Sequence, residues 1–253
     1  MDYGILAMSF VVGMMIGLTS MGGAALMAPF LILGLGVQPV LAVRTDLVYS
    51  AITKVVGTLM HWRQGTVDFA TAGKLAMGSV PGGLLGSACV ILLPRLGIDV
   101  NRSLQRAIGV MLVAVALILL ARVFAGDWLA DRAPHLERLQ GGGAVAWGAI
   151  VGFCVGLTSV GSGSLMVPFL MLVFPLSPAK VVGTDVFHAA ILVSVTGLAH
   201  SAAGPVDWRL VAQLLTGSVP GVMLGSHLAP RVPAKALRAG LAVALLATGI
   251  KMA

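Results

Sequence analysis

Two long apolar stretches of the chain are each interrupted by a short cluster of threonine, serine and glycine residues. Gly17 to Phe30 reads GLTSMGGAALMAPF, and Gly156 to Phe169 reads GLTSVGSGSLMVPF. A helix that breaks inside a membrane leaves backbone N–H groups unpaired, and the helix that restarts directs its dipole and free N–H groups at the break, which suits an anion. The residues expected to bind such an anion are Thr19, Ser20, Gly22 and Gly23 in the first stretch and Thr158, Ser159, Gly161, Ser162, Gly163 and Ser164 in the second.

These small residues also allow a second interpretation, in which they let helices pack closely and kink. The presence of two copies in register favours a binding site over packing alone. The copies differ, because the first has no serine at the positions of Ser162 and Ser164. We therefore expect an asymmetric site in which the second stretch supplies more of the hydroxyl groups.

Ionisable side chains occur at membrane depth in the apolar segment that follows each cluster. At 100° per residue, Asp46 and Lys54 share one side of the first of these segments, and Asp185 and His188 share a similar side of the second. Such groups cost at least ~2.5 kcal/mol each to insert and usually pair or line a pathway. We expect Asp46, Asp185 and His188 to couple transport to a proton or cation, and Lys54 to bind the substrate.

Several of these polar residues also have structural interpretations. Asp46 lies soon after Pro39, where it would pair with Arg44 near the interface and cap the helix. Asp68 and Asp207 follow short turns and are expected to be N-caps of the next segments.

The composition places these residues in an integral membrane protein. Of 253 residues, 58% are hydrophobic and 10% are charged, and apolar runs of roughly 20 residues, long enough to cross a bilayer, follow one another with short loops. The formal charge of +7 comes from basic residues at segment ends, not from a dense basic run, so no nucleic-acid partner is expected. Cys89 and Cys154 lie inside apolar segments, so neither a disulfide nor a metal site is expected.

The chain is also an internal duplication. Adding 139 to each residue number from Gly13 to Ser87 gives Gly152 to Ser226, and the two stretches share 33 identical residues over 75 positions without a gap. We expect an all-α membrane protein of two tandem homologous repeats, each with about four helical segments of which the first is broken in mid-membrane. The repeats are residues 1–125 and 143–253, joined by a linker at 126–142, and they make seven or eight spans if each broken segment crosses once.

The relative direction of the repeats is left open by the sequence. If Thr19 to Gly23 is the tip of a re-entrant hairpin, each repeat crosses the membrane an odd number of times and the repeats are inverted. Two basic loops at equivalent positions would both be cytoplasmic by the positive-inside rule, which favours parallel repeats: Arg95, Arg102 and Arg106, and Arg231, Lys235 and Arg238.

The third segment of each repeat carries glycines spaced four residues apart around a proline. They are Gly78, Gly82 and Gly86 in the first copy and Gly217, Gly221 and Gly225 in the second. This pattern predicts a face that brings another helix very close. Ser79 and Ser218 lie on this segment, where packing is the favoured role and contact with substrate the alternative.

The paired T-S-x-G-x-x-x-L-M-x-P-F motifs, the T-D motifs at Thr45 and Thr184, and the G-S-V-P-G motifs at Gly78 and Gly217 resemble those of the sulfite exporter TauE/SafE family. The resemblance covers nearly the whole chain. It implies a multi-pass permease of the bacterial inner membrane that exports sulfite, organosulfonates or related small sulfur-containing anions, and that is not an enzyme. The expected partners are this anion, a coupling proton and membrane lipid; no cofactor is expected, and a homodimer is compatible with the sequence.

Two other functions are compatible with parts of the sequence. In an intramembrane serine protease, Ser162 or Ser164 would be the nucleophile and His188 or His200 the base, but the duplicated frame has no serine at those positions in its other half. A transporter of a metal or of another small anion would use the same carboxylates and histidines. The helix N-termini at the breaks argue against a cation.

Overall fold

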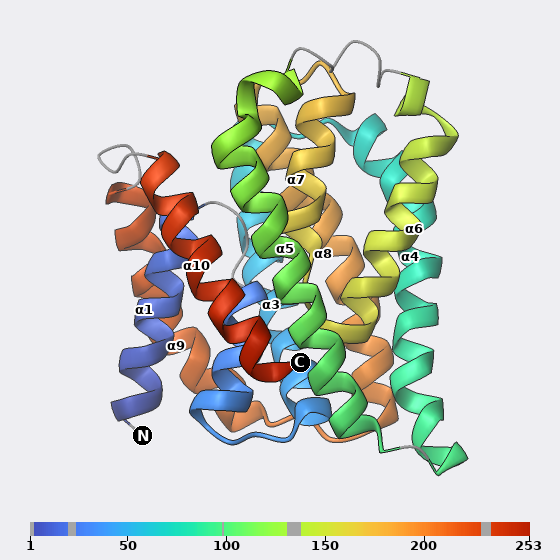
Figure 1. Ribbon diagram of the computed structural model, residues 1–253, viewed down its shortest axis with the longest axis vertical. Helices are drawn as coiled ribbons and strands as arrows, with labels where there is room; N and C mark the ends of the chain where they lie inside the picture. Colours follow the sequence, from blue (N-terminus) through green and yellow to red (C-terminus); the bar gives the residue numbers. More distant parts are fainter. Residues whose placement is uncertain (1–2, 20–23, 98, 131–137, 229–233) are drawn as a thin grey trace.

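The fold is entirely helical in the residues that the computed structural model describes, which are 3–19, 24–97, 99–130, 138–228 and 234–253 (Figure 1). The helices of the first half are α1 (Tyr3–Thr19), α2 (Ala24–Pro29), η1 (Phe30–Gly34), α3 (Pro39–Arg63), α4 (Phe69–Leu92), η2 (Leu93–Leu96) and α5 (Val100–Ala130). Those of the second half are α6 (Gly142–Thr158), α7 (Ser162–Val173), α8 (Pro178–Ala203), α9 (Trp208–Leu228) and α10 (Ala234–Met252).

The helix boundaries follow local sequence signals. Prolines occupy the first positions of α3 and α8, where their missing N–H group costs no helical hydrogen bond. The predicted N-caps are confirmed: Asp68 Oδ1 accepts a hydrogen bond from Thr71 N at 2.8 Å, and Asp207 Oδ1 accepts one from Leu210 N at 2.9 Å. Of the two predicted helix breaks, the second is confirmed, because α6 ends at Thr158 and α7 begins at Ser162. The first is predicted between Thr19 and Gly23, and its residues 20–23 lie outside the described part of the chain.

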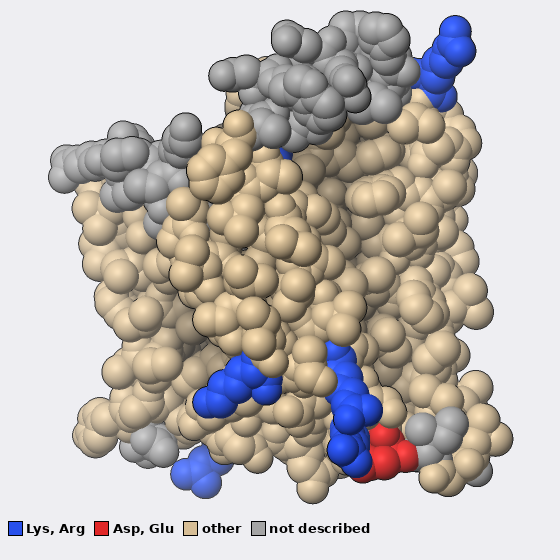
Figure 2. Space-filling view, in the orientation of Figure 1, with Lys and Arg blue, Asp and Glu red and all other residues tan. Residues whose placement is uncertain are grey.

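The surface and the helix lengths fit a membrane-spanning protein. Three of the described helical stretches are long and apolar enough to cross a bilayer, namely Phe69–Leu92, Val100–Phe124 and Pro178–Ala203, and shorter apolar helices accompany them. Figure 2 shows lysine and arginine side chains toward both ends of this face and acidic side chains only at its lower end, with a band without charge between the ends.

Glycine faces join the helices in pairs, as the glycine spacing predicts. A Cβ atom added at Gly78, Gly82 or Gly86 of α4 would meet the α6 backbone at Val145, Ala149 or Phe153. The glycines of α9 lie in the same way against α1, with Gly221 facing Phe10 and Gly225 facing Met14. In both pairs the residue numbers rise together, so α4 runs parallel to α6 and α1 runs parallel to α9.

Two other helix pairs run antiparallel. Gly183, near the start of α8, lies against Thr66 just past the end of α3, whereas Gly204, just past the end of α8, lies against Arg44 near the start of α3. Gly109 of α5 likewise lies against Ala253 at the end of the chain. Figure 1 shows the opposite courses of α5 in green and α10 in red.

The helices α6 and α7 form a hairpin whose two ends lie together. Gln140, just before α6, donates a hydrogen bond from Nε2 to the carbonyl oxygen of Val173, the last residue of α7, at 2.8 Å. The chain therefore enters and leaves this hairpin at the same end of the bundle, and the break at Ser159–Gly161 is its tip.

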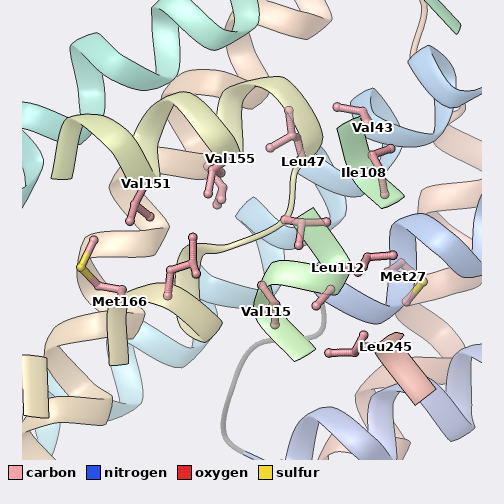
Figure 3. Packing of buried hydrophobic residues seen from close by; sticks show 14 of the residues in the cluster. Met27, Val43, Leu47, Ile108, Leu112, Val115, Val151, Val155, Met166 and Leu245 are labelled. Carbon is pink, nitrogen blue, oxygen red and sulfur yellow. The ribbon is translucent and has the colours of Figure 1, made fainter. Parts of the chain in front are cut away.

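The apolar core surrounds this tip. Figure 3 shows Leu47 of α3, Leu112 of α5 and Val155 of α6 around the connection between α6 and α7, with Met166 of α7 beyond it. These side chains are fully buried. Polar groups at the tip are consequently shielded from lipid, which is the condition for an irregular backbone at membrane depth.

Candidate functional site

The break between α6 and α7 is closed by its own polar groups on the α6 side. Thr158 Oγ1 donates a hydrogen bond to Cys154 O at 2.8 Å and accepts one from Val160 N at 3.2 Å. Ser159 has φ 62°, which makes it the only non-glycine residue with positive φ among those described. This conformation is costly for a residue with a Cβ atom, so surrounding contacts must hold it.

The α7 side of the break presents donors that the protein itself leaves unused. Gly161 has φ 121°, a conformation that favours glycine, and the first helical bond of α7 runs from Leu165 N to Gly161 O at 3.1 Å. The hydroxyl groups of Ser162 and Ser164 are buried and have no hydrogen-bond partner among the described residues. They lie in the first turn of α7, where backbone N–H groups have no partner within the helix. This end of α7 is therefore suited to an anion.

A carboxylate from another helix holds the strained serine in place. Ser159 Oγ donates a hydrogen bond to Asp46 Oδ2 of α3 at 2.7 Å, and both residues are fully buried. Asp46 is inside α3, which begins at Pro39 with Gln38 at its N-cap position. The alternative in which Asp46 caps the helix is therefore wrong.

Lys54 lies within electrostatic range of one carboxylate from each half of the chain. It lies on α3 with 9% of its surface exposed and interacts electrostatically with both Asp46 and Asp185, the latter on α8. His188, about five-sixths of a turn after Asp185 on α8, also interacts with Lys54 and is fully buried. Asp46, Asp185 and His188 thus all lie within electrostatic range of Lys54, and Asp46 also contacts the break.

One serine of the glycine-rich helices contacts this cluster. Ser79 Oγ of α4 lies 2.7 Å from His188 Nε2, and both are buried. The equivalent pair in the other half is Ser218 of α9 and Tyr49 of α3, because adding 139 relates Ser79 to Ser218 and Tyr49 to His188. Both of their hydroxyl groups are buried and have no hydrogen-bond partner among the described residues.

The first-half residues of the candidate site lie mostly outside the described part of the chain. Ser20, Gly22 and Gly23 lie outside the described residues, and of Thr19 only its place as the last residue of α1 is described. For the second stretch, every candidate from Thr158 to Ser164 lies at the break or in the first turn of α7.

The contacts of the histidines do not form the dyad that a serine protease requires. His188 Nε2 pairs with Ser79, and His200 Nε2 donates to Gly156 O at 2.8 Å. Neither Ser162 nor Ser164 pairs with a histidine among the described residues. Within that part of the chain there is also no group of three or more His, Cys, Asp or Glu side chains arranged to hold a metal ion.

The helical architecture and this buried polar break define a multi-pass membrane transporter, and comparison with known proteins gives its family. The profile of the sulfite exporter TauE/SafE family matches residues 5–252, and the chain belongs to that family. It is a protein of the plasma membrane.

Its relatives are transporters by name. The chain is 40% identical to the probable membrane transporter protein YjnA of Bacillus subtilis (strain 168) over 254 residues, covering all of both chains. It is 27% identical to YunE of the same organism, covering 97% of each chain. A probable membrane transporter protein of Xylella fastidiosa (strain Temecula1 / ATCC 700964) is 27% identical over 88% of this chain and 83% of the relative. No solved structure matches the chain.

Proposed function

We propose that this transporter exports small sulfur-containing anions, such as sulfite or organosulfonates, through a site at the break between α6 and α7. The observation that supports this most directly is the pair of buried, unpartnered hydroxyls of Ser162 and Ser164 in the first turn of α7. An oxyanion presents several acceptor oxygens, so it can use these hydroxyls and the N–H groups of the same turn together. Family membership supports the choice of a sulfur oxyanion.

The charges beside the break favour coupling of the anion to a proton. When Asp46, Asp185 and Lys54 are all ionised, and His188 is neutral, the buried group carries one positive and two negative charges. A further anion would then be repelled in a region from which water is excluded. Protonation of Asp46 or Asp185 removes that repulsion, so each anion binds with a proton and the total charge of the group is unchanged.

The helix arrangement supports inverted repeats. The offset of 139 residues relates α3 to α8, and α5 and α10 are the last helices of the two repeats. The two helices of each pair run antiparallel. The two ends of the α6–α7 hairpin lie together, as expected of a re-entrant segment. We therefore retain the domains 1–125 and 143–253 with a linker at 126–142, but favour the inverted arrangement over the parallel one. Because one chain supplies both breaks, a homodimer is not needed to complete the site.

The first-half candidates Thr19, Ser20, Gly22 and Gly23 are retained in the proposal by their equivalence to residues of the second break. Lys54 is retained as a substrate ligand, since it lies within electrostatic reach of both carboxylates and has no lysine counterpart. An anion that approached it would compete with Asp46 and Asp185 for the same positive charge.

Uptake of radiolabelled sulfite into everted membrane vesicles tests the proposal. We expect saturable uptake that organosulfonates reduce and divalent metal ions do not. Vesicles from cells that lack the protein set the background. Saturable uptake of a divalent metal with no response to sulfite would instead favour the cation transporter.

A further inference from the structure

A cavity opens at one end of the α3–α8 pair, and its lining does not include the residues of the break. Its volume is about 560 Å³, and it lies between the start of α3, the end of α4 with η2, and the end of α8. Its lining residues are Arg44, Ile91, Pro94, Ala199, Ala202 and Ala203. Arg44 is the only charged residue among them, so the cavity has a positive charge in otherwise apolar walls.

The guanidinium group of Arg44 is held in this cavity without a carboxylate. Its Nε atom is buried and has no hydrogen-bond partner among the described residues. The group lies directly against Gly204, where a side chain would collide with it. It also lies within electrostatic range of His200. A guanidinium without an anionic partner is a strong site for an oxyanion.

The equivalent position at the other end of the helix pair is closed. The counterpart of Arg44 is Gly183, which packs against Thr66 so closely that no Cβ would fit. Beside it, Thr184 Oγ1 accepts a hydrogen bond from Asp68 N at 2.9 Å and ties α8 to the start of α4.

At the Arg44 end of the pair, the hydrogen bond that corresponds to Thr184–Asp68 is missing among the described residues. The counterpart of Thr184 is Thr45, whose hydroxyl is fully buried and has no hydrogen-bond partner among the described residues. The two ends of the α3–α8 pair are thus in different states, one closed by Gly183 and Thr184 and the other open beside Arg44.

We propose that the cavity beside Arg44 is a second binding site, in which a small oxyanion rests on its way to or from the break between α6 and α7. This inference rests on the transport function proposed above and adds a site to it. The arginine draws the anion into the open end and supplies a planar set of donors for its oxygens.

Two hydrogen bonds lie between this site and the break. His200, which faces Arg44, donates its hydrogen bond to Gly156 O in the last turn of α6, three residues before Ser159. On α3, Asp46 follows Arg44 by two residues and bonds Ser159. The cavity and the buried anion site are therefore separated by only a few side chains.

A thiol placed in the cavity measures its charge directly. In detergent-solubilised protein with Cys89→Ala and Cys154→Ala, Ala202→Cys is labelled with thiol reagents that carry either a sulfonate or a trimethylammonium group. We expect Arg44→Gln to lower the ratio of anionic to cationic labelling rates about fivefold. Arg44→Lys should preserve the ratio, and Arg102→Gln, an exposed arginine near the start of α5, should leave it within about twofold.

A transport measurement completes the test. In everted vesicles, Arg44→Gln should raise the KM for sulfite about tenfold and leave kcat within about twofold, because only an access site is weakened. If Arg44→Gln abolishes folding, a fall of the anionic preference with rising salt in the Arg44 protein gives the same information.

The outcomes separate the two proposals. Loss of the anionic preference in Arg44→Gln, in a protein that moves no sulfite, would keep the Arg44 site and remove the proposed function. Equal labelling ratios with and without Arg44, or a thiol at position 202 that water-soluble reagents do not reach, would overturn the Arg44 site whatever the protein transports.

Discussion

Asp46 on α3 accepts a 2.7 Å hydrogen bond from Ser159, which lies 113 residues away at the tip of the α6–α7 hairpin. The bond joins a carboxylate of one half of the chain to the helix break of the other. It also fixes a serine whose φ of 62° is otherwise unfavourable. The proposed anion site is therefore positioned by a residue that can itself carry a proton.

Removing this bond should loosen the break without removing α7. Ser159→Gly eliminates the hydroxyl and tolerates the positive φ, so it isolates the bond from the backbone strain. We expect a loss of about 1–3 kcal/mol in unfolding free energy, because Asp46 loses a donor, and a raised KM for sulfite. Thermal unfolding and vesicle transport measure the two effects. Ser201→Ala is the control, since its hydroxyl bonds within its own helix to Gly197 O. Equal effects of the two substitutions would contradict a special role for Ser159.

Neutralising the carboxylates should uncouple transport from the proton gradient. In Asp46→Asn or Asp185→Asn, the amide cannot release a proton, so net uptake should no longer respond to an imposed pH gradient. Exchange of labelled for unlabelled sulfite should continue, because the anion ligands remain. Both rates are measured in the same vesicles. Gradient dependence that survives in both single variants would assign these residues a structural role.

Lys54 should matter for anion affinity rather than for coupling. Lys54→Met removes the positive charge between Asp46 and Asp185 while keeping a long side chain. We expect sulfite affinity to fall at least about tenfold, because the uncompensated carboxylates repel the anion more strongly. Lys180→Met, at an exposed position near the start of α8, is the matched control. A KM within the error of the wild type would remove Lys54 from the site.

The α4–α6 contact should tolerate no added methyl group. A Cβ at Gly82 would meet Ala149 O, so Gly82→Ala must push the helices apart and should cost about 1–3 kcal/mol. Gly73→Ala on the same helix has nothing within 4 Å of the new atom and should be neutral or slightly stabilising. Thermal unfolding in detergent compares them. Equal melting temperatures would show that the close approach of α4 and α6 does not support the fold.

Local features of this molecule could be predicted from the sequence because their causes are local. The second cluster of threonine, serine and glycine predicted the end of α6, and the turn residues predicted the N-caps Asp68 and Asp207. Glycine spacing gave the close faces of α4 and α9.

The contacts between helices and their relative directions were harder to predict from the sequence. The pairing of Asp46 with Ser159 depends on which helices become neighbours, and helical periodicity reports only which side of one helix is polar. The basic loops favoured parallel repeats, whereas α3 and α8 run antiparallel, because a rule about charge at the membrane surface does not register a hairpin that turns back inside the bundle.

The sequence also did not predict that the two ends of the α3–α8 pair differ in their hydrogen bonds. Thr45 and Thr184 belong to identical T-D motifs, yet of the two only Thr184 accepts a hydrogen bond from an N-cap residue, Asp68 of the other half. Identical motifs do not distinguish these two environments, because the contacts depend on which helices become neighbours.

The central claim is that the first turn of α7 binds the transported anion, and sulfite uptake by Ser162→Gly with Ser164→Ala tests it most directly. This double variant gives the second break the residues that stand at the same positions in the first, Gly23 and Ala25. We predict saturable uptake with a KM raised about tenfold and a retained maximal rate, since two hydroxyl ligands are lost and the N–H groups remain. Wild-type kinetics in the double variant, or no saturable sulfite uptake by the wild type, would contradict the account.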